Sequence, residues 1–270
     1  MAHSIGMSGS TILSNRDRLP ELFGKGLPHV EIGEFGDRDS YLSFLHLARE
    51  NEVSFGIHVP HFRENSKYDL LEEVKMKPSA ARKLFVEEVR EAARSGASYV
   101  LVHFPYFKGE MEAAVEKIEE GLQFLKHLQD TYGVPIVCEP KLGQNQSPAG
   151  IQYLYDFPMN LWGKYGLSIC IDMGDYRIAV ENNWRKYVEP LLPFTKVVHM
   201  HNVRFTEKGY IWTPIHPDFE KQDTAFDMAP FLELLAKGRD KYFILEHTPH
   251  TSPSEEQVDE GIVWVMEQLK

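Results

Sequence analysis

The stretch Gly-Val-Pro-Ile-Val-Cys-Glu-Pro, residues 133–140, carries the main fold signal of this 270-residue chain. Gly133 follows residues 111–132, in which apolar side chains recur at helical spacing, and a glycine in that place is typical of a helix end. The apolar run after it has the length of a buried strand and ends on Glu139. Pro140 cannot donate a hydrogen bond to a neighbouring strand, so the strand is expected to end there. The stretch therefore predicts a helix, a tight turn and a buried strand with a carboxylate at its C-terminal end.

The same alternation repeats along the chain. Short apolar runs that read as strands occupy residues 5–8, 30–33, 53–59, 98–104, 134–139, 167–173, 196–203 and 242–247. Each is followed by a segment with helical spacing or helix-end signals, at residues 15–26, 38–51, 80–95, 111–132, 148–164, 176–193, 227–239 and from 252 onward. Eight strands that alternate with helices in one domain, residues 1–270, predict a (β/α)8 TIM barrel of the α/β class. A doubly wound open sheet is the alternative, but the Gly-x-Gly-x-x-Gly spacing that usually follows its first strand is absent.

Composition excludes several classes of protein. No apolar run approaches the roughly 18 residues that span a bilayer, and the first residues lack the pattern of a secretory signal. Cys138 and Cys170 both fall inside apolar runs, which excludes a disulfide scaffold and fits a reducing compartment, so we expect a cytoplasmic protein. The formal net charge of −11 disfavours nucleic acid as a partner, because phosphate binding draws most of its strength from cations.

Ligand-type side chains gather where the predicted strands end. Seven of the twelve histidines lie there, and the whole set comprises Glu31, Glu34, His58, His61, His103, Glu139, Asp172, Asp175, His199, His201, Glu246, His247 and His250. The active sites of TIM barrels lie at the C-terminal ends of the strands. A single polar residue at a strand end is usually structural, but several carboxylates buried at one barrel mouth are costly without a cation. The set therefore predicts a divalent metal ion, whereas His3, His29, His46 and His127 are expected to be structural or surface residues.

Strand alternation assigns directions to some of these side chains. His199 and His201 are two residues apart, so both are expected to face the barrel mouth. Cys138 should face the helix layer as inert packing, since it precedes the inward Glu139. Cys170 shares the inward direction of Asp172 and is expected to lie deeper in the barrel.

These segments together resemble the xylose-isomerase-like barrels, which include sugar isomerases and epimerases and the AP-endonuclease type of phosphodiesterase. The resemblance extends from residue 5 to the closing helix. Residues 136–140, Ile-Val-Cys-Glu-Pro, are similar to the family segment whose Glu is a metal ligand, and 168–172, Ser-Ile-Cys-Ile-Asp, match the segment whose Asp is one. His-Met-His-Asn-Val-Arg at 199–204 resembles the family stretch His-Leu-Lys-Asp-Val-Arg, and Ile-Leu-Glu at 244–246 matches the last ligand. The resemblance implies a metal quartet of Glu139, Asp172, His199 and Glu246.

Two further positions resemble the endonuclease branch, which binds more than one zinc. His58 and His103 match its extra histidine ligands and would form a second site if one is present. Asp175 departs from that branch, which has a histidine there. Asn145 departs from the epimerase branch, which carries a second glutamate at that place. Neither branch is matched in full.

The resemblance implies a sugar or polyol isomerase or epimerase that uses a divalent ion, Mn²⁺, Zn²⁺, Co²⁺ or Mg²⁺, and no organic cofactor. Glu139 and Glu246 would then move a proton next to a carbonyl. The expected substrate is a small molecule in the class of sugars and their derivatives, and no membrane partner is expected. The side chains expected to bind this substrate are His58, His103, Asp175, His201 and Arg204.

Two alternatives stay open at this point. In the first, the chain is a zinc-dependent phosphoester hydrolase of the AP-endonuclease type, in which Arg63, Lys141 and Arg204 meet the phosphate. In the second, it is a non-catalytic barrel that binds a metal. The connection 203–226 is expected to be a lid or a contact between copies, and a homo-oligomer is left open.

Overall fold

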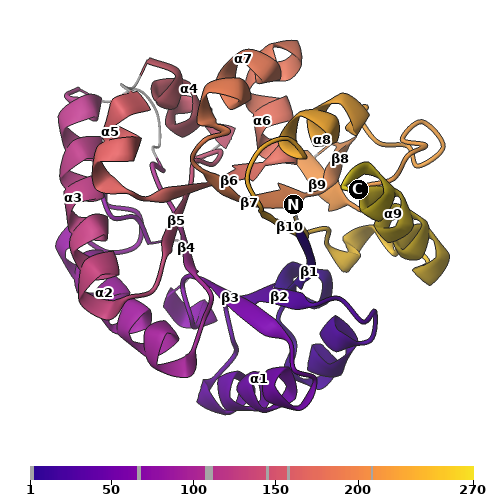
Figure 1. Ribbon diagram of the computed structural model, residues 1–270, viewed down its shortest axis with the longest axis horizontal. Coiled ribbons are helices and arrows are strands. Elements are labelled where there is room, and N and C mark those ends of the chain that lie inside the picture. The colour runs from indigo at the N-terminus through magenta and orange to yellow at the C-terminus, as the bar shows by residue number, and fades with distance from the viewer. Residues whose placement is uncertain (1–2, 66–67, 107–111, 144–145, 157–158, 208) are drawn as a thin grey trace.

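Eight parallel strands close into a barrel in the computed structural model of this chain, and helices surround them (Figure 1). The structure describes residues 3–65, 68–106, 112–143, 146–156, 159–207 and 209–270. The strands follow one another around the barrel in sequence order, and the last pairs with the first. The predicted TIM barrel is thus confirmed. Within the described residues, no helix combines the length and apolar character needed to cross a membrane.

The barrel strands lie close to the places that the apolar runs predicted. They are β1 (Ser4–Ser8), β2 (His29–Ile32), β3 (Ser54–His58), β4 (Val100–His103), β5 (Ile136–Glu139), β6 (Ser168–Asp172), β7 (Thr195–Met200) and β10 (Tyr242–Leu245). In this register Asp172 pairs with His199 and His103 pairs with Glu139. Side chains at neighbouring strand ends therefore lie side by side at the mouth.

One predicted strand is shorter than expected. The run 196–203 was expected to be a single strand, but β7 ends at Met200 and His201 has no strand conformation. The chain then forms an antiparallel hairpin of β8 (Asn202–Thr206) and β9 (Gly209–Thr213). The hairpin occupies part of the connection 203–226, for which the sequence had predicted no regular structure. The Asn202 side chain stabilises the turn into this hairpin, because its Oδ1 accepts the backbone N–H groups of Val203 and Phe226 and its amide donates to the Phe226 oxygen.

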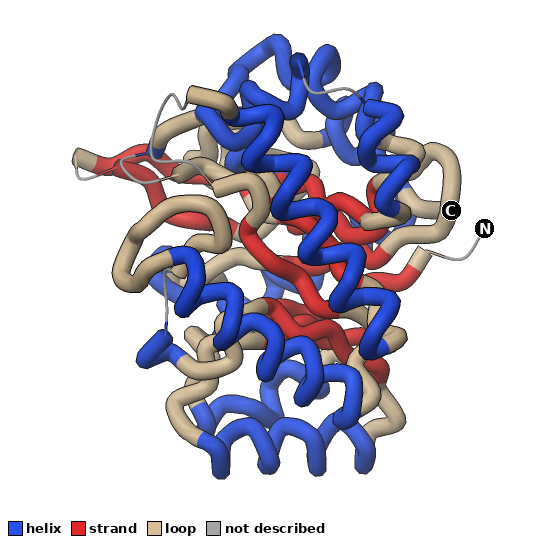
Figure 2. Tube along the Cα trace, turned by 90° about the vertical axis from the view of Figure 1, so that its left-hand side faces the viewer, coloured by secondary structure: helices blue, strands red, loops and turns tan. Residues whose placement is uncertain are grey.

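The helices form the outer layer, and the strands lie inside it (Figure 2). Their bounds are α1 (Arg38–Glu50), α2 (Pro78–Ser95), α3 (Ala114–Tyr132), α4 (Ala149–Asp156), α5 (Met159–Tyr165), α6 (Met173–Val180), α7 (Trp184–Val188), α8 (Ala229–Leu235) and α9 (Glu255–Gln268). Gly96 and Gly133 end α2 and α3 with positive φ angles of 82° and 70°, as their places in the sequence predicted.

Three weaker helix predictions need correction. Residues 15–26 contain a 3-10 helix, Arg16–Phe23, with Pro20 inside it, because proline lacks the N–H that an α-helix would use there. Residues 148–164 hold α4 and α5 rather than one helix, and residues 157–158 lie outside the described part of the chain. Residues 176–193 also divide, since Glu181 takes a positive φ of 45° after α6.

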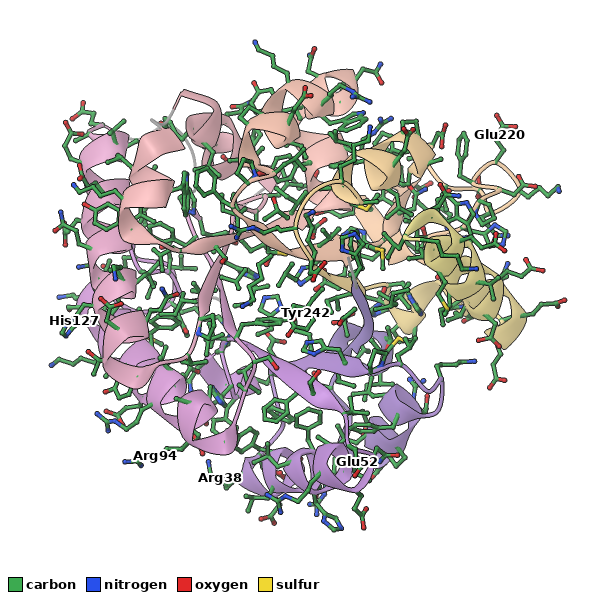
Figure 3. The ribbon with its side chains drawn as sticks, viewed as in Figure 1. Arg38, Glu52, Arg94, His127, Glu220 and Tyr242 are labelled. Carbon is green, nitrogen blue, oxygen red and sulfur yellow. The ribbon has the colours of Figure 1, made fainter. Side chains whose placement is uncertain are left out.

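Apolar packing separates into two layers, as the strand alternation predicted. The inner layer fills the barrel and consists of Tyr99, Leu101, Val137, Cys170, Val197 and Ile244. Cys138 belongs instead to the larger layer between strands and helices. His127 lies on the outer surface of α3 (Figure 3), and His46 is also exposed, as expected for surface residues.

Candidate active site

Four strand ends bring the predicted metal ligands together at the barrel mouth. Glu139 ends β5, Asp172 ends β6, His199 lies near the end of β7, and Glu246 directly follows β10. Because these strands are neighbours in the barrel, one ligand atom from each of the four side chains lies within 4.8 Å of the others. All four side chains are buried. The tertiary structure thus gathers residues that are spread over more than a hundred positions of the sequence.

The contacts within this quartet suit a divalent ion. His199 Nδ1 lies 3.1 Å from Glu139 Oε1 and 2.9 Å from Glu246 Oε2. Among the described residues, Glu139 Oε2 and Glu246 Oε2 find no partner with hydrogen-bond geometry, although both atoms are buried. Three carboxylates and one imidazole are a donor set for a hard or borderline cation. The residues present therefore fit a divalent metal ion.

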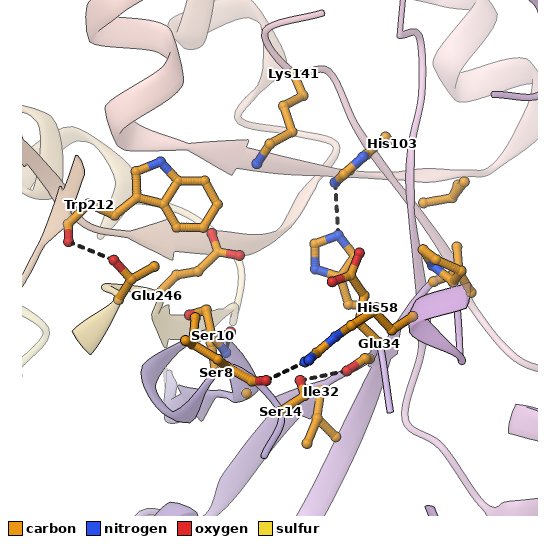
Figure 4. Close-up of a pocket in the computed structure, with 18 of the residues that line it drawn as sticks. Ser8, Ser10, Ser14, Ile32, Glu34, His58, His103, Lys141, Trp212 and Glu246 are labelled. Carbon is orange, nitrogen blue, oxygen red and sulfur yellow. Dashed lines mark hydrogen bonds between the residues drawn. The ribbon is translucent and has the colours of Figure 1, made fainter. Parts of the chain in front are cut away.

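His58 and His103 form a second cluster beside the quartet. Their Nε2 atoms lie 2.9 Å apart, and the dashed line in Figure 4 marks this contact. Glu139 Oε2 lies 3.6 Å from His58 Nε2 and 3.2 Å from His103 Nε2. Glu139 is consequently shared by the two clusters, so the residues offer positions for a second cation next to the first.

Lys141, which was expected to meet a phosphate only in the hydrolase alternative, lies among the carboxylates of the site. It follows β5 by two residues, and its ammonium nitrogen lies 3.3 Å from Glu139 Oε1 and 3.4 Å from Asp172 Oδ2. Burial alone would lower the pKa of Lys141, but Glu139, Asp175 and Asp172 raise it well above its usual range. Lys141 is therefore a buried cation at the floor of the site.

Behind Lys141 lies a layer of polar and aromatic side chains. His201 Nε2 lies 2.9 Å from Asp172 Oδ1, and the ring of His201 stacks on Trp212 at 4.7 Å between centroids. Asp175 accepts hydrogen bonds from the backbone N–H of Leu142 at 3.2 Å and from Tyr210 Oη at 3.3 Å. Burial raises the pKa of Asp175 above its usual range, and nearby Asp172 adds to this. The hairpin β8–β9 thus supplies two aromatic residues to the site.

Glu31, one of the ligand-type residues at the predicted strand ends, contacts two histidines of the site. It lies on β2 and is fully buried, with its carboxylate 2.8 Å from His199 Nε2 and 3.3 Å from His58 Nδ1. Burial alone would raise its pKa, but His199 and His58 hold the pKa of this carboxyl far below its usual range. Its alternation with Val30 and Ile32 was the available signal, since a glutamate inside an apolar strand must point somewhere polar.

A cavity of about 580 Å³ opens above these residues (Figure 4). Glu246, His58, His103, Lys141 and Trp212 line it together with residues that follow β1, β2 and β3. The lining does not include five buried residues of the site: Glu139, Asp172, Asp175, His199 and His201. The volume falls in the range of small-molecule sites, about 300–1,000 Å³.

Arg204 does not belong to this lining. It lies on β8 opposite Ile211 and is partly exposed, so the structure lends no support to its expected contact with substrate. Arg63, in contrast, lines the outer part of the cavity and donates a hydrogen bond to the backbone oxygen of Leu13. Asn145 lies outside the described residues.

One wall of the cavity is fixed from behind by a buried carboxyl. Tyr68 lines the cavity, and its Oη donates a hydrogen bond of 2.6 Å to Glu88 Oε2 on α2. The other oxygen of Glu88 accepts the backbone N–H of His61 at 2.7 Å. Burial raises the pKa of Glu88 to about 7. His61 thus lies behind the wall rather than in the site.

Comparisons with known proteins agree with the fold. No curated protein sequence is similar enough to the chain to count as a match. Among solved structures, a D-tagatose 3-epimerase-like protein is 19% identical with a TM-score of 0.66, and the match covers 99% of this chain and 100% of that one. A D-psicose 3-epimerase, solved in the presence of D-fructose, is 12% identical with a TM-score of 0.64, covering 98% and 99%.

A third structure contains a metal. It is a xylose isomerase-like TIM barrel protein from Mycobacterium smegmatis in complex with magnesium, 13% identical with a TM-score of 0.55, and the match covers 94% of this chain and 89% of that one. At such identities the likeness concerns the fold. The family model described as xylose isomerase-like TIM barrel matches residues 24–268, nearly the whole chain. The chain therefore belongs to the family of xylose isomerase-like TIM barrels.

Proposed function

We propose that this protein is a divalent-metal-dependent isomerase or epimerase of sugars or polyols that transfers a proton next to a carbonyl group. One observation carries the proposal. Glu139 and Glu246 meet at His199 Nδ1, at 3.1 and 2.9 Å, and Glu246 also reaches the cavity. A proton transfer of this kind needs carboxylates beside a group that stabilises negative charge on oxygen.

Glu139, Asp172, His199 and Glu246 would hold the ion, and the donor set suits Mn²⁺, Mg²⁺, Co²⁺ or Zn²⁺. When bound, such an ion would supply a Lewis acid that polarises a carbonyl oxygen. The buried carboxylate oxygens without a hydrogen-bond partner support this assignment.

Other steps of the reaction would be performed by side chains of the protein. Glu246 lies at the cavity surface, where its carboxylate can take a proton from a carbon next to the carbonyl. Lys141 stays protonated, so its ammonium can donate a hydrogen bond to a substrate oxygen in the cavity. His58 and His103 line the cavity and offer polar contacts to hydroxyls. Asp175 and His201 would act indirectly, by holding Lys141 and Trp212 in place.

The class of substrate follows from cavity and charge. A cavity of about 580 Å³ suits a monosaccharide or a modest derivative of one. The net charge of −11 does not suit a polymeric nucleic acid. The printed names of the structural neighbours, D-tagatose 3-epimerase-like protein and D-psicose 3-epimerase, support ketoses as the first substrates to test.

Solvent exchange tests the proposal directly. The protein is loaded with Mn²⁺, Co²⁺, Mg²⁺ or Zn²⁺ and incubated in D₂O with D-fructose, D-psicose or D-tagatose, and proton NMR follows the carbon next to the carbonyl. We expect deuterium at that carbon and a new sugar signal. Glu246→Gln should slow both by at least about 100-fold, because amide cannot accept the proton.

Glu233→Gln is the matched control, because Glu233 is exposed on α8 and pairs with the exposed Lys237. It should exchange at the wild-type rate. Absence of exchange with every metal and every ketose would count against the isomerase proposal.

A second candidate function rests on the His58–His103–Glu139 cluster. If two zinc ions bind side by side, a phosphoester hydrolase of the AP-endonuclease type becomes the better proposal. Hydrolysis of bis-p-nitrophenyl phosphate by the zinc-loaded protein would favour it. A protein that binds the metal yet performs neither reaction would fit the non-catalytic barrel.

A further inference from the structure

Glu31 lies at the centre of a buried polar network beneath the proposed metal site. Its Oε1 atom lies 2.8 Å from His199 Nε2 and 3.3 Å from His58 Nδ1. Its Oε2 atom accepts a hydrogen bond of 2.8 Å from Tyr99 Oη. Glu31 and Tyr99 are buried, and His58 is half-buried. Three donors therefore converge on one carboxylate: His199 from β7, His58 from β3 and Tyr99 from the residue directly before β4.

The protonation of each group decides the directions of these hydrogen bonds. An ionised carboxylate only accepts, so Tyr99 Oη–H must point to Glu31. His29 Nε2 lies 3.1 Å from the same Tyr99 oxygen. Burial lowers the pKa of His29 to about 4, so its ring is neutral, and its Nδ1 lies 2.9 Å from Ser54 Oγ. The hydroxyl hydrogen of Tyr99 thus points toward Glu31.

The carboxylate of Glu31 also bears on the two histidines that face the site. With a cation in the quartet, His199 Nδ1 would give its lone pair to the ion, and the ring proton would lie on Nε2, toward Glu31. His58 would carry its proton on Nδ1, also toward Glu31, which leaves Nε2 toward His103. Both free lone pairs are directed to the proposed cation positions. The alternative tautomers would place an N–H against each cation.

The space for this network is built into the barrel. A Cβ atom at residue 56 would lie 2.3 Å from the Tyr99 ring, so Gly56 leaves room for that ring. The interior of a TIM barrel is normally filled with branched apolar residues. A buried tyrosine and histidine in that layer are costly unless their polar atoms are satisfied, and here Glu31 satisfies them.

We propose that Glu31 is a positioning residue of the metal site, which binds no metal itself but orients His199 and His58 as ligands. Its oxygens are already engaged by three donors, and it lies on the far side of both rings from the Glu139 carboxylate. Carboxylates that accept the second N–H of a ligand histidine fix its tautomer and raise its basicity. This inference rests on the proposed function, since it assumes that the quartet binds a metal.

The test measures metal affinity in variants of the full chain. Isothermal titration with Zn²⁺ and with Mn²⁺ gives the Kd of the wild type, Glu31→Gln and Tyr99→Phe. We expect Glu31→Gln to raise the Kd about 10- to 100-fold, because the amide cannot accept from both His199 and Tyr99. Tyr99→Phe removes one donor and keeps the carboxylate, so its Kd should rise by less, about two- to ten-fold.

Glu88→Gln is the matched control. It also replaces a buried carboxyl that binds a tyrosine hydroxyl, but it lies on α2 away from the quartet. Its Kd for metal should equal that of the wild type. Circular dichroism of the metal-free variants shows whether each one is folded. If Glu31→Gln does not fold, the Kd of Tyr99→Phe decides the test.

A spectroscopic readout separates positioning from general destabilisation. Long-range ¹⁵N–¹H NMR of the zinc-loaded wild type should show the His199 proton on Nε2 and the His58 proton on Nδ1. Equal Kd values for the wild type and both variants, or the opposite tautomers, would overturn the positioning role and leave the proposed function intact. A wild-type protein that binds no divalent metal would overturn both.

Discussion

The ammonium nitrogen of Lys141 lies 3.3 Å from Oε1 of Glu139, inside the carboxylate cluster that would hold a divalent ion. Asp172 and Asp175 oxygens lie 3.4 and 3.7 Å from the same nitrogen. A fixed positive charge at these distances stabilises the carboxylates but repels a second cation. Under the proposed function, Lys141 would therefore link substrate binding to metal affinity.

Replacing Lys141 with methionine should tighten metal binding. The variant removes the charge and keeps the length of the side chain, so we expect the Kd for Mn²⁺ or Zn²⁺ to fall at least about ten-fold. Ketose isomerisation should fall at the same time, because the hydrogen-bond donor is lost. Titration calorimetry measures the first effect and NMR the second. Lys126→Met is the control, since Lys126 pairs with Asp130 on the surface of α3. A Lys141→Met Kd equal to or above that of the wild type would contradict the prediction.

Removing His103 should distinguish one cation from two. Under the proposed isomerase function the quartet alone holds the ion, so His103→Asn should keep the metal content of the wild type. Elemental analysis of both proteins after gel filtration gives this comparison. If the variant loses one zinc per chain relative to the wild type, the His58–His103–Glu139 cluster binds metal. That result would favour the phosphoester hydrolase over the isomerase.

Glu88 predicts a pH dependence of stability. Burial raises its pKa from 4.5 to about 7, so the folded state binds a proton that the unfolded state releases between these values. The contribution of Glu88 to stability is fully present below about pH 4.5 and is lost as pH rises through about 7. Between pH 4.5 and 8 the loss amounts to about 3 kcal/mol.

Glu88→Gln isolates this effect, because the amide does not titrate. His61 titrates nearby, and burial lowers its pKa to about 4, so the wild type and variant are compared at each pH. Urea unfolding at pH 5, 6, 7 and 8 should show the wild type losing stability relative to Glu88→Gln as pH rises. A difference that stays constant over this range would show that Glu88 is ionised throughout.

Gly174 should tolerate no side chain. It lies on α6, and a Cβ there would come within 2.1 Å of His201 Cε1, whose ring is held by Asp172 and Trp212. Gly174→Ala should therefore destabilise the fold by about 1–3 kcal/mol in urea unfolding. Gly163→Ala on α5 is the contrasting variant, since its nearest neighbour would be 3.8 Å away. It should stabilise the protein by roughly 0.5–1 kcal/mol through helix propensity. A stable Gly174→Ala protein would show that the His201 ring can move.

The hairpin β8–β9 could not be predicted from the local sequence. The run 196–203 has the composition of one strand, but Asn202 binds backbone groups at Val203 and Phe226 and turns the chain. A side chain that competes with strand hydrogen bonds in this way depends on a partner more than twenty residues away. The place of Tyr210 in the site could not be predicted for the same reason.

The sequence by itself determined the barrel and the polar residues at its mouth. The alternation of apolar runs and helix signals fixed the order of the strands, and strand periodicity separated Cys138 in the outer layer from Cys170 in the barrel. These features are local, because hydrophobic period and helix-end residues act within a few positions. The resemblance to a family then implied the metal quartet of Glu139, Asp172, His199 and Glu246. The order of the strands explains why these four side chains lie close together.

Only the tertiary structure decided the contacts of Glu31 and Lys141. Glu31 and His199 are 168 positions apart, and they meet because closure of the barrel places β2 and β7 across one narrow interior. Lys141 lies in a loop, and three carboxylates from two strands and a helix draw its ammonium inward. Such contacts arise from closure and from the balance between burial and charge, which no local pattern encodes.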